Sequence, residues 1–280
     1  MKNRNRNPFS FANINLLGKC NVDCFFCLGK DLEDDFGRYG NNLLKQEPED
    51  WRQFPEFIET CKEHEIKKVY ITGQNTDAFC YPHLGHLLGV LNAEHWFDTV
   101  GVRTNGFFST DPVTFHLIND FDSVGYSIHT LNPLIQRAIL GKSKVPDWPW
   151  ILNNTRTHCR VSIVVNRFNW KEVDDLLQFL SGFECVDYIQ LRKVCTDTRA
   201  GLLREDMDAF ETVTAGIMEN ISGNMESYES APSVEIYGKD VTFWRTVETT
   251  ANSINYFIDG TLSEEYFVIE GYAKKHGLEL

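Results

Sequence analysis

Short apolar runs rich in β-branched and aromatic side chains recur along much of the chain. Polar or glycine-containing segments bound these runs, a pattern typical of β-strands. We therefore expect strands at residues 12–17, 67–72, 99–104, 123–128, 160–165 and 187–192.

Between the runs, apolar residues recur at helical spacing. In residues 49–65, Trp51, Phe54, Phe57 and Cys61 come close to the i, i+3, i+4, i+7 pattern of an amphipathic helix. Residues 84–91 are too apolar to show a clear helical period, but with their flanks they have the length of a helix. Further helices are predicted over residues 170–179 and 204–221.

The alternation of strand and helix predicts parallel β/α units with right-handed crossovers. Six such units are too few for a closed eight-stranded barrel, which leaves a partial barrel or an open doubly wound sheet. In both architectures, functional side chains gather at the carboxyl ends of the strands. The expected fold class is α/β, a partial (β/α)6 barrel of parallel strands with a short β-rich C-terminal extension.

Beyond about residue 222 the pattern changes to short alternating segments. Residues 233–237 and 241–244 flank Gly238 and predict a hairpin. Residues 255–258 and 265–269 flank an Asp-Gly pair and predict a second one. We expect a barrel over residues 1–222 and an extension packed on it over residues 223–280.

Composition narrows the classes of partner. The 280 residues are 42% hydrophobic and carry a formal charge of −13, which disfavours a nucleic-acid polymer as partner. No apolar run approaches the roughly 18–20 residues needed to span a bilayer, and no signal-peptide core is visible near the N-terminus. We expect a cytoplasmic protein without a membrane partner, in which the 8 cysteines are thiols and not disulfides.

Three of these cysteines, Cys20, Cys24 and Cys27, directly follow the first predicted strand. Three thiolates at this spacing can converge from one loop on an iron–sulfur cluster and leave one iron open to a small molecule. Zinc is the alternative, although a structural zinc site takes four ligands, and residues 28–52 contain neither Cys nor His. A third interpretation is that the cysteines are unrelated core residues.

This C-x3-C-x2-C motif, with the aromatic Phe26 before its third cysteine, resembles that of the radical S-adenosylmethionine (SAM) superfamily. The resemblance covers roughly residues 10–195. It implies a [4Fe–4S] cluster on the three cysteines, SAM as second cofactor, Phe26 near the adenine, and an electron donor such as flavodoxin or ferredoxin. Because no cysteine follows Cys195, we expect a single cluster.

The ends of the later strands are compared with the same family. Gly73, Gln74 and Asn75 stand where the family has a Gly-Gly-Glu segment that binds the methionyl amino group, so this motif is degenerate. The turn that contains Thr104 resembles the Thr-Asn-Gly turn common in the family, and its glycine permits a positive φ. The resemblance implies further SAM contacts at Ser127, Asn166 and Arg192. Asn169 is expected to be the N-cap of the next helix.

The sequence indicates less about the substrate than about the cofactors. The leading hypothesis is an enzyme that acts on a small metabolite or nucleotide, and the alternatives are a peptide-modifying enzyme, such as an epimerase, and a metal-binding module without turnover. Cys80 and Cys195 follow strand ends and are weak candidates for a catalytic hydrogen-atom donor. Conceivable substrate contacts are Asp77, Tyr126, Arg137, Lys142, Tyr237 and Trp244.

Overall fold

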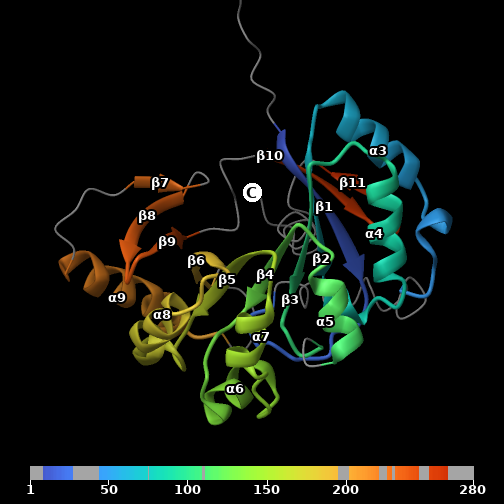
Figure 1. Ribbon diagram of the computed structural model, residues 1–280. Helices are drawn as coiled ribbons and strands as arrows, with labels where there is room; N and C mark the ends of the chain where they lie inside the picture. The colour runs from blue at the N-terminus through green and yellow to red at the C-terminus, as the bar shows by residue number, and fades with distance from the viewer. Residues whose placement is uncertain are drawn as a thin grey trace, which may run out of the picture. The chain divides into compact units, whose positions relative to one another are not determined.

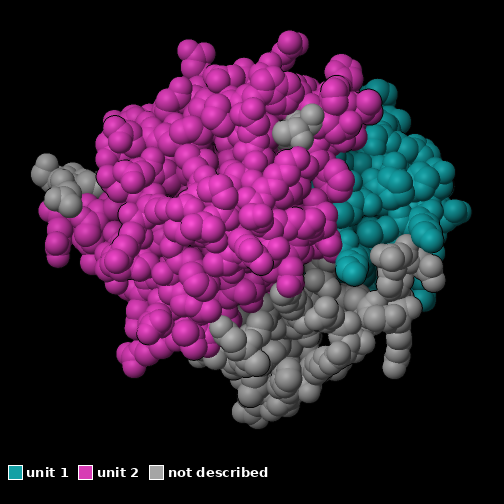
Figure 2. All heavy atoms as spheres, turned by 90° about the horizontal axis from the view of Figure 1, so that it is seen from below, with its two compact units in different colours: residues 1–19, 29–102, 250–280 teal, residues 20–28, 103–249 magenta. Residues whose placement is uncertain are grey.

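The computed structural model describes residues 9–27, 44–74, 76–108, 111–194, 202–220, 226–228, 231–245 and 252–263. The chain divides into two compact units (Figure 2). Unit 1 comprises residues 1–19, 29–102 and 250–280, and unit 2 comprises residues 20–28 and 103–249. The cysteine loop therefore belongs to unit 2, although the strand before it belongs to unit 1.

Unit 1 is built around strands in the order β11-β10-β1-β2-β3. All neighbours are parallel except β10 and β11. The strands are β1 (Phe9–Leu17), β2 (Lys68–Gln74), β3 (Thr99–Thr104, whose last two residues belong to unit 2), β10 (Asn252–Phe257) and β11 (Leu262–Ser263). The helices are η2 (Pro48–Asp50), α3 (Phe54–Glu63), η3 (Ala78–Cys80) and α4 (Leu84–Ala93), with α3 and α4 on the same side of β1 in Figure 1.

The two faces of β1 have different chemistry. Ala12, Ile14 and Leu16 are fully buried, as expected for the face that helices cover. On alternate positions, Asn13 and Asn15 are also buried. A buried amide is costly unless it is hydrogen-bonded, and these two bond to side chains of neighbouring strands. Asn13 Nδ2 donates to Asn255 Oδ1 at 2.9 Å, and Asn15 Oδ1 accepts from Gln74 Nε2 at 3.0 Å.

Unit 2 is built around strands in the order β4-β5-β6-β9-β8-β7. The first four are parallel, and β8 and β7 add antiparallel neighbours. The strands are β4 (Ser123–Ser127), β5 (His158–Val165), β6 (Val186–Lys193), β7 (Glu226–Tyr228), β8 (Ala231–Ile236) and β9 (Lys239–Trp244). The helices are α5 (Pro112–Ile118), α6 (Pro133–Leu140), α7 (Trp148–Asn154), η4 (Trp170–Glu172), α8 (Val173–Ser181) and α9 (Arg204–Asn220).

The predicted fold class is confirmed as α/β with mostly parallel strands. Each of the six expected strands is present within about two to three residues of its predicted bounds. The arrangement is compatible with a partial (β/α)6 barrel followed by antiparallel strands. In the part of the chain that is described, no helix is long and apolar enough to cross a membrane.

The C-terminal strands are divided between the two units. Strands β7, β8 and β9 belong to unit 2, and strands β10 and β11 belong to unit 1. The hairpin predicted around Gly238 is present as β8 and β9, and β9 also pairs in parallel with β6. In the second hairpin, β10 pairs in parallel with β1, and its antiparallel partner is β11, while residues 265–269 lie outside the described residues. The division into residues 1–222 and 223–280 stays a prediction.

Three helices of unit 2 have no counterpart in the sequence prediction. They are α5, α6 and α7, each only seven or eight residues long. Each has a proline in its first turn and a side-chain N-cap, supplied by Asp111, Asn132 and Asp147 respectively. Capping residues followed by proline are a recognised helix start signal. Apolar periodicity missed these helices because they are too short to develop it.

Two glycines of unit 1 allow a matched test of backbone packing. A Cβ at Gly73 would lie 2.0 Å from the carbonyl oxygen of Thr76, whereas a Cβ at Gly89 in α4 would have nothing within 4 Å. We expect Gly73→Ala to lower the free energy of unfolding by about 1–3 kcal/mol. We expect Gly89→Ala to raise it by about 0.5–1 kcal/mol, because alanine restricts the unfolded chain. Urea denaturation measures both, and equal stabilities for the two variants would contradict the packing argument.

Candidate functional site

Cys20, Cys24 and Cys27 lie in the loop that follows β1, and all three are half-buried. The backbone N–H of Cys27 donates to the carbonyl of Cys24 at 3.1 Å, which closes a tight turn between these two cysteines. The loop thus presents three thiols within eight residues of chain. Thiols are soft donors that suit iron–sulfur clusters and zinc.

The loop is attached to the C-terminal end of α6. The backbone N–H groups of Asp23 and Phe25 donate to the carbonyls of Leu140 and Ile139 at 2.9 and 3.1 Å. The last carbonyls of a helix have no partner inside the helix, so the loop satisfies groups that would otherwise lack one. Gly141 ends the helix with a φ of 71°, and a Cβ there would lie 3.3 Å from the Cβ of Asp23. This glycine therefore permits the close approach of loop and helix.

The turn after β3 holds the start of the loop. Asn105 Nδ2 donates to Asn21 Oδ1 at 2.7 Å and lies 3.8 Å from the sulfur of Cys20. Thr104 is buried, and its Oγ1 accepts from the backbone N–H of Gly106, whose φ is 78°. The positive φ expected for this glycine is confirmed. The contribution of Asn105 to the cysteine loop was not predicted, because it depends on a partner 84 residues away.

Phe26 packs against a buried histidine at the end of β4. Its ring meets that of His129 edge-on, with centroids 5.2 Å apart. His129 Nδ1 lies 3.2 Å from the backbone N–H of Val164 and accepts from it, which assigns the proton of the neutral ring to Nε2. Burial lowers the pKa of His129 to about 4. The ring beside Phe26 is therefore neutral at pH 7.

Asn166 is fully buried at the end of β5. Its Nδ2 donates to the carbonyl of Val164 at 2.9 Å, and its Oδ1 accepts from the N–H of Phe168 at 3.0 Å. These bonds show a role in shaping the turn, and its contact with SAM stays a prediction. Asn169 stands at the N-cap position of η4, as expected, but its side chain makes no cap bond. That side chain instead accepts from Asn166 N–H and donates to the carbonyl of His129, joining two strand ends.

Two further predicted SAM contacts also lie in unit 2. Ser127 ends β4, half-buried and in register with Ser162 of β5. Arg192 lies near the end of β6 with its guanidinium 5.6 Å from the ring centroid of Trp244. These residues lie at or after strand ends, and the SAM contacts expected of Phe26, Thr104, Ser127 and Arg192 stay predictions.

The remaining predicted site residues belong to unit 1 or are not described. Gly73 and Gln74 end β2, and Gln74 is buried. Cys80 is half-buried at the end of η3. Asn75 and Cys195 lie outside the described residues. The roles proposed for these five residues stay predictions.

Two of the conceivable substrate contacts are buried and hydrogen-bonded. Asp77 is buried and caps η3 by accepting from the N–H of Phe79 at 3.0 Å. Tyr126 is fully buried, with its hydroxyl 3.2 Å from that of Thr155. Burial makes both poor candidates for contact with a substrate.

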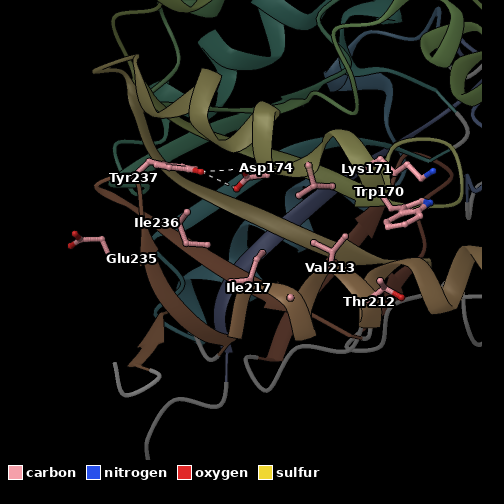
Figure 3. A pocket seen from close by; sticks show the side chains of 11 residues that line it. Trp170, Lys171, Asp174, Thr212, Val213, Ile217, Glu235, Ile236 and Tyr237 are labelled. Carbon is pink, nitrogen blue, oxygen red and sulfur yellow. Dashed lines mark hydrogen bonds between the residues drawn. The ribbon is translucent and has the colours of Figure 1, made fainter. Parts of the chain in front are cut away.

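An open groove of about 730 Å³ lies in unit 2 between α8, α9 and the β8–β9 hairpin (Figure 3). At one end the hydroxyl of Tyr237 donates to both carboxylate oxygens of Asp174, at 3.0 and 3.1 Å. None of the predicted cofactor or metal residues lines it. The lining residues are Trp170, Lys171, Val173, Asp174, Thr212, Val213, Gly216, Ile217, Glu235, Ile236 and Tyr237.

The fold is similar to that of SuiB from Streptococcus suis, whose structure was solved bound to the precursor peptide SuiA. The two share 15% identity with a TM-score of 0.54, over 94% of this chain and 61% of that one. This likeness shows the fold, and the chain spans less than two thirds of the SuiB chain.

Two other solved structures match with lower TM-scores. TYW1 with a bound lysine-pyruvate adduct shares 20% identity and a TM-score of 0.44, over 78% of this chain and 73% of that one. The protein anSMEcpe with bound AdoMet shares 11% identity and a TM-score of 0.46, over 74% of this chain and 60% of that one. No protein-family model and no curated protein matches the sequence.

The buried His129 predicts a pH dependence of stability. Because folding lowers its pKa from 6.5 to about 4, its contribution to stability is complete above pH 6.5 and is lost as the pH falls toward 4. Between pH 7 and pH 5, we expect wild type to lose about 2 kcal/mol of unfolding free energy that His129→Gln does not lose. Chemical denaturation at both pH values measures this, with His158→Gln at an exposed position as control. The same loss in His129→Gln as in wild type would contradict it.

Proposed function

We propose that this chain is a radical SAM enzyme in which Cys20, Cys24 and Cys27 bind a [4Fe–4S] cluster. The observation that carries the proposal is the C-x3-C-x2-C loop, held by the end of α6 and by the turn after β3. The loop occurs in a fold shared with SuiB. Anchoring of this kind favours a preorganised metal site, because the loop that carries the thiols is held in place before the metal binds.

The donor set fits such a cluster. Three thiolates ligate three irons and leave the fourth iron open to the amino and carboxylate groups of SAM. When bound, the cluster would supply the one-electron reduction that cleaves SAM. The electron would come from a donor protein such as flavodoxin or ferredoxin.

The residues around the loop would bind and orient SAM. Phe26 offers an aromatic face to the adenine, and the neutral His129 behind it fixes the ring without placing a charge there. Ser127 has a hydroxyl for the ribose or carboxylate. The Arg192 guanidinium suits a carboxylate, which it can bind through two parallel hydrogen bonds.

The second strand would supply the contact with the methionyl amino group. The carboxylate of the family motif is replaced here by amides, and the side-chain oxygen of Gln74 or Asn75 can accept from an ammonium. A neutral acceptor forms a weaker bond to a cation than a carboxylate does. We therefore expect this chain to bind SAM more weakly than a chain that has the glutamate of the Gly-Gly-Glu segment.

For the substrate we propose a small metabolite or nucleotide from which the radical abstracts hydrogen. A peptide substrate is the second candidate, and the observation that favours it is the likeness to SuiB, which was solved with its precursor peptide.

Cys80 and Cys195 are the proposed candidates for returning a hydrogen atom to the product. Replacing either should leave SAM cleavage intact and stall turnover or change the product.

Anaerobic reconstitution tests the cluster directly. We expect about four irons per wild-type chain and dithionite-dependent formation of 5′-deoxyadenosine. Cys20→Ser, Cys24→Ser and Cys27→Ser should each lose most of the iron and all 5′-deoxyadenosine. Cys61→Ala is the matched control, because burial raises the pKa of this thiol to about 12 and makes it a poor ligand.

Stoichiometric zinc without iron would overturn the proposal in favour of a metal-binding module. Iron bound equally by wild type and the three serine variants would also overturn it. If the cluster and 5′-deoxyadenosine are confirmed, deuterium transfer from labelled candidate substrates into 5′-deoxyadenosine separates a small-molecule substrate from a peptide.

A further inference from the structure

The guanidinium of Arg167 lies against two phenylalanine rings that also contact each other, and one of them belongs to the cysteine loop. Its Cζ is 5.0 Å from the ring centroid of Phe25 and 4.6 Å from that of Phe168. The two rings stand at 88° to each other with centroids 5.6 Å apart. A guanidinium within about 6 Å of an aromatic face is attracted to it. Arg167 thus connects the turn after β5 to the residue that follows Cys24.

A buried carboxylate holds this arginine in place. Asp206 of α9 is fully buried and forms an ion pair with Arg167, whose side chain is 22% exposed. Its carboxylate also accepts from the backbone N–H groups of Leu203 and Arg167, at 2.9 and 3.2 Å. Buried charges occur in proteins when they are paired and hydrogen-bonded, and this carboxylate meets both conditions. The side chain of Arg167 is therefore held both by Asp206 and by the two phenylalanine rings.

We propose that Arg167 is a positioning residue for the iron–sulfur cluster. Arg167 fixes the cysteine loop through Phe25, and its positive charge stabilises the reduced cluster. The inference rests on the proposed function. Phe25 lies directly after Cys24 and two residues before Cys27, so a restraint on its ring limits the movement of both thiols. Its backbone is already held by α6, and Arg167 adds the restraint on its side chain.

The effect proposed for the charge of Arg167 follows from the negative charge that the cluster gains when it is reduced. Reduction adds one negative charge to the cluster, and a nearby positive charge favours that state and raises the midpoint potential. A largely buried guanidinium is screened by salt less than an exposed one. Removing the charge should therefore make the cluster harder to reduce, with the iron content unchanged.

The test is an anaerobic redox titration of the reconstituted protein, followed by the EPR signal of the reduced cluster, with iron content measured on the same samples. Arg167→Gln should bind iron as wild type does and shift the midpoint potential to a more negative value. Arg167→Lys keeps the charge and loses the planar stack, so it should recover most of the shift. Arg245→Gln is the matched control, because Arg245 also pairs with an acid, Glu211, and lies over a ring, 5.5 Å from that of Phe210.

Arg167→Gln leaves a buried carboxylate without its partner, which can prevent folding. The double variant Arg167→Gln with Asp206→Asn replaces the pair by neutral amides and keeps an acceptor for one of the two N–H groups. It should bind iron and retain a negative shift smaller than that of Arg167→Gln, because the loss of the Asp206 charge offsets part of the loss of the guanidinium, which is the member of the pair that contacts Phe25.

A wild-type midpoint potential in the single and double glutamine variants would overturn the inference and leave the proposed function standing. An equal shift in Arg245→Gln would overturn it as well, since the effect would then not depend on contact with the cysteine loop. If wild-type protein binds no cluster, the proposed function fails and this inference fails with it.

Discussion

The candidate site depends on two backbone hydrogen bonds, from Asp23 and Phe25 of the cysteine loop to the last carbonyls of α6. They satisfy donors and acceptors that helix and loop would otherwise leave without partners. They also require a sharp end to the helix, which Gly141 supplies with its positive φ. A loop held by backbone bonds keeps its shape whatever its side chains bind. The thiols can therefore serve as ligands without also having to fold the loop.

At the strand ends, buried asparagine side chains hydrogen-bond groups that would otherwise lack partners. Asn105 bonds to the cysteine loop, while Asn166 and Asn169 bond to the backbone around the end of β5. Where a strand ends, its backbone groups lose their ladder partners, and a short amide side chain offers both a donor and an acceptor. The same residue type that resembles a ligand contact in the sequence can thus be needed by the fold itself. Asn169 is the clearest example, since its side chain links two strand ends and caps no helix.

The sequence predicted the elements that have a long, regular pattern. The six parallel strands, α3, α4, α8 and α9 all appear close to their expected positions because their burial repeats with a strand or helix period. The short helices α5, α6 and α7 were missed, although α6 is the one that anchors the cysteine loop. Their signal is local and chemical, a capping side chain followed by proline, and it is independent of apolar periodicity.

The sequence by itself determined the proposed donor set, because the spacing of Cys20, Cys24 and Cys27 is a local property of eight residues of chain. It also determined the strand that precedes them and the order of the polar turns that follow. Only the tertiary structure decided what surrounds the loop. Arg167 and Asp206 are 39 residues apart, and neither is near Phe25 in the sequence. Such contacts arise when parallel strands bring their ends together, and no local pattern records which side chains then meet.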